Sequence, residues 1–217
     1  KNMKFIMESE LKMLKVISRL SDEHSLDVIS TYLGAHTFPS DSDREEYLNW
    51  LLGDSLGIYS EHAEYFDVFS EDGAFSLEET GLLLTAAAKA GFKLKAHAGQ
   101  FTDLGAAGLA ASLGAVSVDH LENINDKDLD IMAEAGTVAV FLPGVPFFLQ
   151  SVVYPDAKRF LERGIPVALA SDFNPGSCPS YSMQMMITLG VLSCGMSVAD
   201  AVLGATINAA RAINRED

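Results

Sequence analysis

Short apolar segments recur along the chain, and segments with helical periodicity separate them. Most of the apolar segments are apolar at both odd and even positions, which is typical of strands covered on both faces. They lie at residues 27–36, 65–71, 93–99, 115–122, 137–144 and 166–172. The pattern therefore predicts a parallel sheet whose strands alternate with helices, the arrangement of an α/β protein.

The segments between the predicted strands carry helix start and stop signals. Ser76 with Glu79, and Ser197 with Asp200, have the spacing of a capping box, and Asn125 can cap a further helix. Glycines stand where helices should end, at Gly91, Gly114, Gly136 and Gly164. The predicted strand ends recur every 23 to 35 residues, close to the roughly 30 residues of a unit in a (β/α)8 barrel. Six units are visible, so we expect one domain over residues 1–217, an incomplete TIM barrel.

Composition narrows the classes of partner. A chain of 217 residues with 48% hydrophobic residues can bury a sizeable core. Its formal charge of −15 argues against binding nucleic acid or an anionic membrane surface. Cys178 and Cys194 form no CxxC pair, and the longest apolar stretches contain Pro and Gly and are too short to span a membrane. We therefore expect a soluble cytoplasmic protein with free thiols.

Titratable residues stand at the ends of five predicted strands: His36, Glu71, His97, His120 and Asp172. The active site of an α/β barrel lies at the carboxyl ends of its strands. Any single histidine there can instead serve only to bond a neighbouring loop, but five such residues together indicate a site. Imidazole and carboxylate bind Zn²⁺, so His97 and Asp172 are candidate metal ligands. Glu71 either lines the site or pairs with a loop.

The last predicted strand runs into the sequence SDFNPGS. Pro175 fixes its φ angle and Gly176 relieves steric limits, so the following N–H groups and the Ser177 hydroxyl can converge on a carboxylate. The alternative is an ordinary Asx-Pro turn, in which the Asn174 side chain only caps backbone groups. The preceding Asp172 favours the first interpretation.

Several of these stretches resemble the imidazolonepropionases, which belong to the metal-dependent amidohydrolase superfamily. The resemblance rests on TYLGAH (31–36), DVFSEDGAFS (67–76), KAHAGQ (95–100), VDHLE (118–122) and ASDFNPGS (170–177), and it extends across nearly the whole chain. It implies a (β/α)8 barrel with one zinc or iron ion. It also implies hydrolysis of the cyclic amide of 4-imidazolone-5-propanoate to N-formimino-L-glutamate, a step of histidine degradation.

The resemblance assigns roles to individual residues. His97 and Asp172 correspond to metal ligands, and His120 corresponds to the histidine that faces the substrate carbonyl. Asp172 and His120 are therefore the expected catalytic residues, with Asp172 moving the proton of the attacking water. The implied substrate-binding residues are His36, Gln100, Asn174, Gly176 and Ser177, the last three around the carboxylate arm of the small-molecule substrate.

The chain also departs from the family pattern. Family members carry a His-x-His pair at the end of their first strand, and no such pair occurs here. The resemblance begins at the third strand, so we expect a fragment or a shortened protein whose activity requires the absent strands. Open sheet edges favour a homo-oligomer. Two alternatives stay open: a non-catalytic barrel that binds a small carboxylate ligand, and another amidohydrolase reaction such as deamination.

Overall fold

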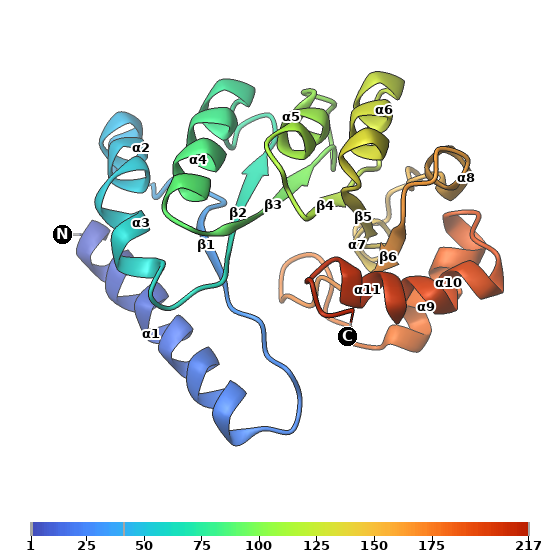
Figure 1. Ribbon diagram of the computed structural model, residues 1–217, viewed down its shortest axis with the longest axis horizontal. Helices are drawn as coiled ribbons and strands as arrows, with labels where there is room; N and C mark the ends of the chain where they lie inside the picture. Colours follow the sequence, from blue (N-terminus) through green and yellow to red (C-terminus); the bar gives the residue numbers. More distant parts are fainter. Residues whose placement is uncertain (1, 41, 217) are drawn as a thin grey trace.

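The computed structural model describes residues 2–40 and 42–216, which form one curved parallel sheet with helices along its outer side (Figure 1). The six strands follow one another in the sheet in the order of the sequence. They are β1 (Thr31–Ala35), β2 (Tyr65–Ser70), β3 (Lys93–Ala98), β4 (Ser117–His120), β5 (Val138–Phe141) and β6 (Val167–Leu169). Each predicted apolar segment contains one of them, so the predicted strands are confirmed.

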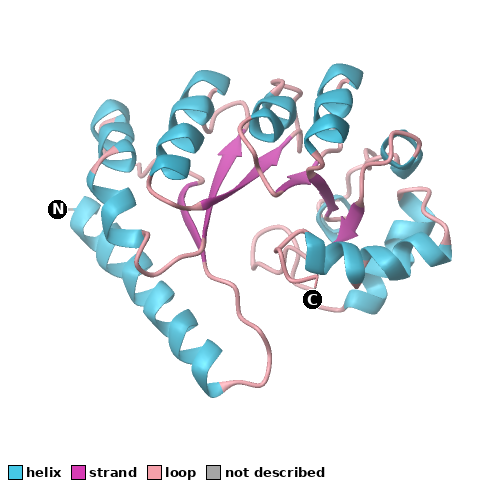
Figure 2. Cartoon of the chain, viewed as in Figure 1, coloured by secondary structure: helices cyan, strands magenta, loops and turns pink. Residues whose placement is uncertain are grey.

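Helices precede, connect and follow the strands, and they lie along the convex side of the sheet (Figure 2). They are α1 (Asn2–Glu23), α2 (Arg44–Leu52), α3 (Asp54–Tyr59), α4 (Leu77–Lys89), α5 (Ala106–Ser112), α6 (Asp126–Ala135), α7 (Gly144–Phe148), α8 (Ala157–Leu161), α9 (Met183–Ser193), α10 (Val198–Gly204) and α11 (Ile207–Arg211). Within the described ranges no helix is both long and apolar enough to cross a membrane.

The predicted capping signals set the helix boundaries. Ser76 and Glu79 form a capping box at the start of α4, in which each side chain accepts a hydrogen bond from the other residue's backbone N–H. The same pair of bonds joins Ser197 and Asp200 at the start of α10. Gly136 ends α6 with a φ angle of 71°, a conformation that glycine adopts without strain. These local bonds fix the residue at which each of these helices begins or ends.

The sheet has an apolar outer face and a partly polar inner face. On β3, Leu94, Ala96 and Ala98 are buried against the helices, whereas Lys95 and His97 point to the inner side and are partly exposed. All residues of β5 are buried. The expectation of two apolar faces therefore holds for β5 and fails for β3, because the inner side of the central strands lines a cavity.

In the described part of the chain, β1 and β6 each pair with a single strand, so the sheet is open. The fold is that of a partial TIM barrel, as expected from the sequence. All strands run in the same direction, so their carboxyl ends meet at one rim.

Candidate active site

A cavity of about 510 Å³ lies at this rim and extends down the inner face of the sheet. All of the site residues expected from the sequence line it except Gly176. They are His36, His97, Gln100, His120, Asp172, Asn174 and Ser177. The wall also contains Asp67, Lys95 and Asp119, which the sequence reasoning did not single out. His97 and Asp172, although far apart in the sequence, thus face a common space.

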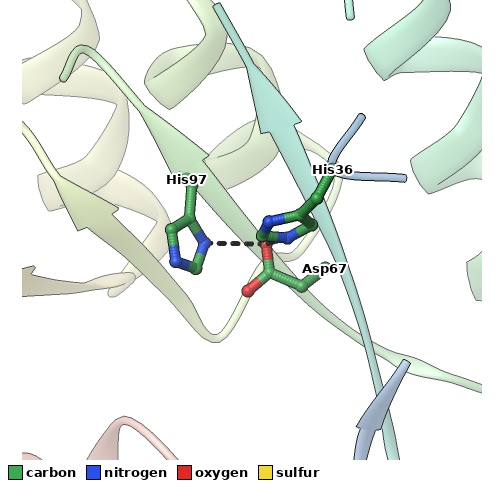
Figure 3. Close-up of side chains that lie close together, drawn as sticks. All are labelled: His36, Asp67 and His97. Atoms are coloured by element: carbon green, nitrogen blue, oxygen red, sulfur yellow. Dashed lines mark hydrogen bonds and ion pairs between the residues drawn. The ribbon is translucent and has the colours of Figure 1, made fainter. Parts of the chain in front are cut away.

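Asp67 lies at the centre of a cluster with two histidines (Figure 3). It projects from the middle of β2, and its side chain is almost fully buried. Its Oδ1 atom is 2.9 Å from Nδ1 of His97 and 3.3 Å from Nε2 of His36. An ionised carboxylate only accepts hydrogen bonds, so both of these ring nitrogens carry protons in this arrangement. The only sequence signal for Asp67 was an acidic residue inside the apolar stretch YFDVFS.

The charges of this cluster stabilise one another. Burial alone would lower the pKa of His97, but the negative charge of Asp67 and its hydrogen bond outweigh burial and raise this pKa to about 9. The charges of Asp119 and Asp172 act in the same direction. Burial would raise the pKa of Asp67, yet His97 and His36 hold it well below its usual range. Without a metal, His97 is therefore an imidazolium among carboxylates.

The donor set of the cavity fits a divalent metal ion. Ligand atoms of His36, Asp67 and His97 lie within 4.8 Å of one another, and Asp172 lines the same cavity. Imidazole nitrogen and carboxylate oxygen are ligands of zinc and of non-haem iron. Metal-binding histidines commonly donate their second ring N–H to a carboxylate, as His97 does to Asp67. His97 Nε2 then remains for the metal, once it has lost its proton.

His120 ends β4 next to this cluster. Its ring centroid is 5.3 Å from that of His97, and the two rings meet edge to face. The φ angles of His120 and Leu121 are 80° and 69°, a left-handed conformation that is uncommon for residues other than glycine. Such strain concentrates at functional sites and persists only where surrounding structure enforces it. Here it places the His120 side chain in the cavity wall.

The turn after β6 is closed by the Asn174 side chain. Asn174 Oδ1 accepts hydrogen bonds from the backbone N–H groups of Gly176 and Ser177, both at 2.8 Å. Asn174 Nδ2 donates to the Asp172 carbonyl at 2.8 Å and to Ser177 Oγ at 2.7 Å. This is the Asx-type turn of the alternative interpretation. Both N–H groups are bonded within the turn, so the expectation that they converge on a ligand is wrong. The Ser177 hydroxyl accepts the bond from Asn174, so its own O–H group can still donate a hydrogen bond to a ligand in the cavity.

Glu71 does not line the cavity. Its side chain is buried, and it accepts hydrogen bonds from the N–H groups of Phe101 and Thr102, at 2.8 and 3.2 Å, and from the Thr102 hydroxyl. These residues belong to the loop between β3 and α5. Of the two interpretations left open by the sequence, the structure supports pairing with a loop. The same loop contains Gln100, which does face the cavity.

Solved structures with the same architecture define the class of fold. A Xaa-Pro dipeptidase superposes on 94% of this chain and 62% of its own with a TM-score of 0.66 and 17% sequence identity. Guanine deaminase from C. acetobutylicum superposes on 95% of this chain and 56% of its own with a TM-score of 0.65 and 15% identity. The fold is that of the amidohydrolase barrels. No family model matches the chain.

Sequence comparison identifies relatives within this class of fold. The chain is 44% identical over 215 residues to the imidazolonepropionase of Symbiobacterium thermophilum, a match that covers 97% of this chain and 51% of that protein. The resemblance to the imidazolonepropionases is thereby confirmed. The chain spans about half the length of the curated relatives it matches.

Proposed function

We propose that these 217 residues belong to an imidazolonepropionase-type hydrolase, which opens the ring of 4-imidazolone-5-propanoate and gives N-formimino-L-glutamate in histidine degradation. One observation carries the proposal: His97, His120 and Asp172 line one cavity at the carboxyl ends of the strands. The 44% identity to an imidazolonepropionase supports this choice among the reactions of amidohydrolase barrels.

His97 and Asp172 would hold the divalent metal, which is zinc or iron, and Asp67 would orient His97 from behind. When bound, the metal supplies a Lewis acid that polarises a carbonyl and lowers the pKa of water to about 7. His36 lies beside Asp67 and lines the same cavity. It brings a further ring nitrogen to this part of the cavity, where it would contact the substrate.

The chain's own residues would divide the proton transfers. Asp172 accepts a proton from the attacking water, whose oxygen bonds to the carbonyl carbon of the ring. With a proton on each ring nitrogen, His120 would donate a hydrogen bond from the nitrogen that faces the cavity to the developing oxyanion, an interaction typically worth about 3 kcal/mol. Asp172 then returns the proton to the ring nitrogen as the C–N bond breaks. Water is thereby added across the amide, and Asp172 ends the cycle ionised.

The carboxylate arm of the substrate would lie at the turn after β6. The Ser177 hydroxyl would donate a hydrogen bond to the arm. Asn174 holds Ser177 in place through the hydrogen bond from Nδ2 to Oγ. At Gly176 an added Cβ atom would lie 3.3 Å from Asn174 Oδ1, so a residue without a side chain suits this tight turn. Gln100, on the neighbouring loop, would contact the imidazolone ring.

The remaining expectations concern partners and location. The partner would be a small molecule with a carboxylate arm, since the net charge of −15 disfavours nucleic acid and anionic membranes. The open edges of β1 and β6 favour a homo-oligomer in which a second copy covers them. The two cysteines, both buried as free thiols, suit the cytoplasm.

Turnover should be measured on the whole gene product that contains these residues, by the loss of imidazolone absorbance. Asp172→Asn should lower kcat by at least about 100-fold, the typical contribution of a general base. His24→Gln, at an exposed position after α1, is the control and should leave kcat unchanged. Turnover within twofold of wild type in Asp172→Asn would contradict the proposal. Ammonia release from a heterocyclic amine would instead favour deamination, and ligand binding without turnover would favour the non-catalytic alternative.

A further inference from the structure

Among the described residues, His120 and Glu122 each have one buried side-chain atom without a hydrogen-bond partner. Their side chains are 3% and 4% exposed. Nδ1 of His120 and Oε2 of Glu122 are buried without a partner, while Nδ1 lies 3.6 Å from the other carboxylate oxygen of Glu122. A buried polar group without a partner is costly, so two such groups at this distance point to each other as partners.

The backbone around this pair is fixed from both sides. Leu121 N–H donates to the Ala98 carbonyl at 3.1 Å, and Asn123 N–H donates to the Gly99 carbonyl at 2.7 Å. The left-handed conformations of His120 and Leu121 occur within this bonded segment. Carboxylate end groups rotate over a broad range, so a small rotation of Glu122 brings an oxygen within hydrogen-bond distance of His120.

Within the described part of the chain, no other group forms a hydrogen bond with Nδ1 of His120. The His97 ring meets the His120 ring edge to face, and Asp119 precedes His120 in the chain. The Cys194 thiol stands near Glu122; burial raises the pKa of Cys194 to about 12, and the charge of Glu122 adds to this effect. The thiol therefore stays protonated, and Oε2 of Glu122 accepts no hydrogen bond from it.

We propose that Glu122 is the positioning residue of His120. Its carboxylate accepts a hydrogen bond from Nδ1, which holds the ring so that Nε2 points into the cavity. A carboxylate behind a histidine fixes both the tautomer and the orientation of the ring. The value of this for catalysis rests on the proposed function, in which His120 meets the substrate carbonyl. The pairing itself does not depend on that function.

The test is NMR of the histidine ring nitrogens in the 217-residue chain, at a pH where His120 is neutral. The spectrum of His120→Gln identifies the signals of this ring. The expected result is a proton on Nδ1 and none on Nε2. Glu122→Met removes the acceptor at similar volume and should change the ratio of the two tautomers at least tenfold. Glu134→Met makes the same replacement at an exposed position of α6 and should leave the ratio unchanged.

Two results would overturn the pairing: a wild-type ring protonated on Nε2, or a tautomer ratio that moves less than twofold in Glu122→Met. If Glu122→Met does not fold, Glu122→Leu, which also removes the acceptor, replaces it under the same criteria, and the wild-type spectrum alone still decides the first of them. Turnover plays no part in the measurement. An inactive gene product would therefore contradict the proposed function and leave the result for Glu122 as it stands.

Discussion

The buried carboxylate of Glu71 holds the loop between β3 and α5, and its replacement tests how the cavity rim is built. Oε2 accepts hydrogen bonds from the N–H groups of Phe101 and Thr102, at 2.8 and 3.2 Å. Oε1 accepts from the Asp72 N–H at 2.9 Å and from the Thr102 hydroxyl. Four donors thus share one carboxylate that is only 3% exposed.

The expected loss in the free energy of unfolding follows from these hydrogen bonds. Glu71→Gln keeps the shape of the side chain but turns one acceptor oxygen into an NH₂ group, which faces two donors. A buried donor left without an acceptor costs about 1–3 kcal/mol. The NH₂ group takes the place of Oε1, since the Thr102 hydroxyl can then rotate away and only the Asp72 N–H is left without an acceptor, so the expected loss in the free energy of unfolding is about 1–3 kcal/mol.

Urea denaturation measures this loss, and amide hydrogen exchange locates it. Exchange should accelerate at Asp72, whose N–H loses its acceptor, and in the loop that the Thr102 hydroxyl no longer bonds to residue 71. Glu134→Gln, the same change at an exposed position of α6, should alter the free energy of unfolding by less than about 0.5 kcal/mol. A loss below about 0.5 kcal/mol for Glu71→Gln, with unchanged exchange in the loop, would refute the reasoning.

Two further predictions concern the same region. In metal-free protein the pKa of His97 is about 9, above the unfolded value of 6.5, so its ion pair with Asp67 stabilises fully below about pH 6.5 and is lost as the pH rises through 9. Urea unfolding should show a loss of about 3 kcal/mol between about pH 6 and pH 10, and this loss should be smaller in Asp67→Asn; a flat wild-type profile would contradict this. Gly99→Ala should destabilise by at least about 2 kcal/mol more than Gly114→Ala, because both glycines have positive φ angles but only Gly99 has a backbone oxygen, that of Asn123, where the Cβ atom would lie. Equal thermal stabilities of the two variants would count against that contact.

The sequence was sufficient for elements that local chemistry determines. The strands, the capping boxes at Ser76 and Ser197, and the glycine after α6 depend on neighbouring residues only, and the structure has them as expected. The position of the site could be predicted from one rule, that parallel strands present their carboxyl ends at the same edge of the sheet. Residues at those ends, such as His97 and His120, could therefore be placed together without coordinates.

Asp67 could not be found in this way. It lies in the middle of a strand, and a lone acidic residue there does not reveal that His36 and His97 approach it from the two neighbouring strands. The turn after β6 was ambiguous for a related reason. Whether the N–H groups of Gly176 and Ser177 face a ligand or the Asn174 side chain depends on backbone angles that the residue types leave open.

The central claim, that His97 and Asp172 share one metal-binding cavity, is tested most directly by titrating Zn²⁺ into the metal-free chain by calorimetry. The account predicts one ion per chain, at least tenfold weaker binding in both His97→Gln and Asp172→Asn, and unchanged binding in the exposed control His24→Gln. Zinc affinity that is the same in wild type, His97→Gln and Asp172→Asn would contradict it.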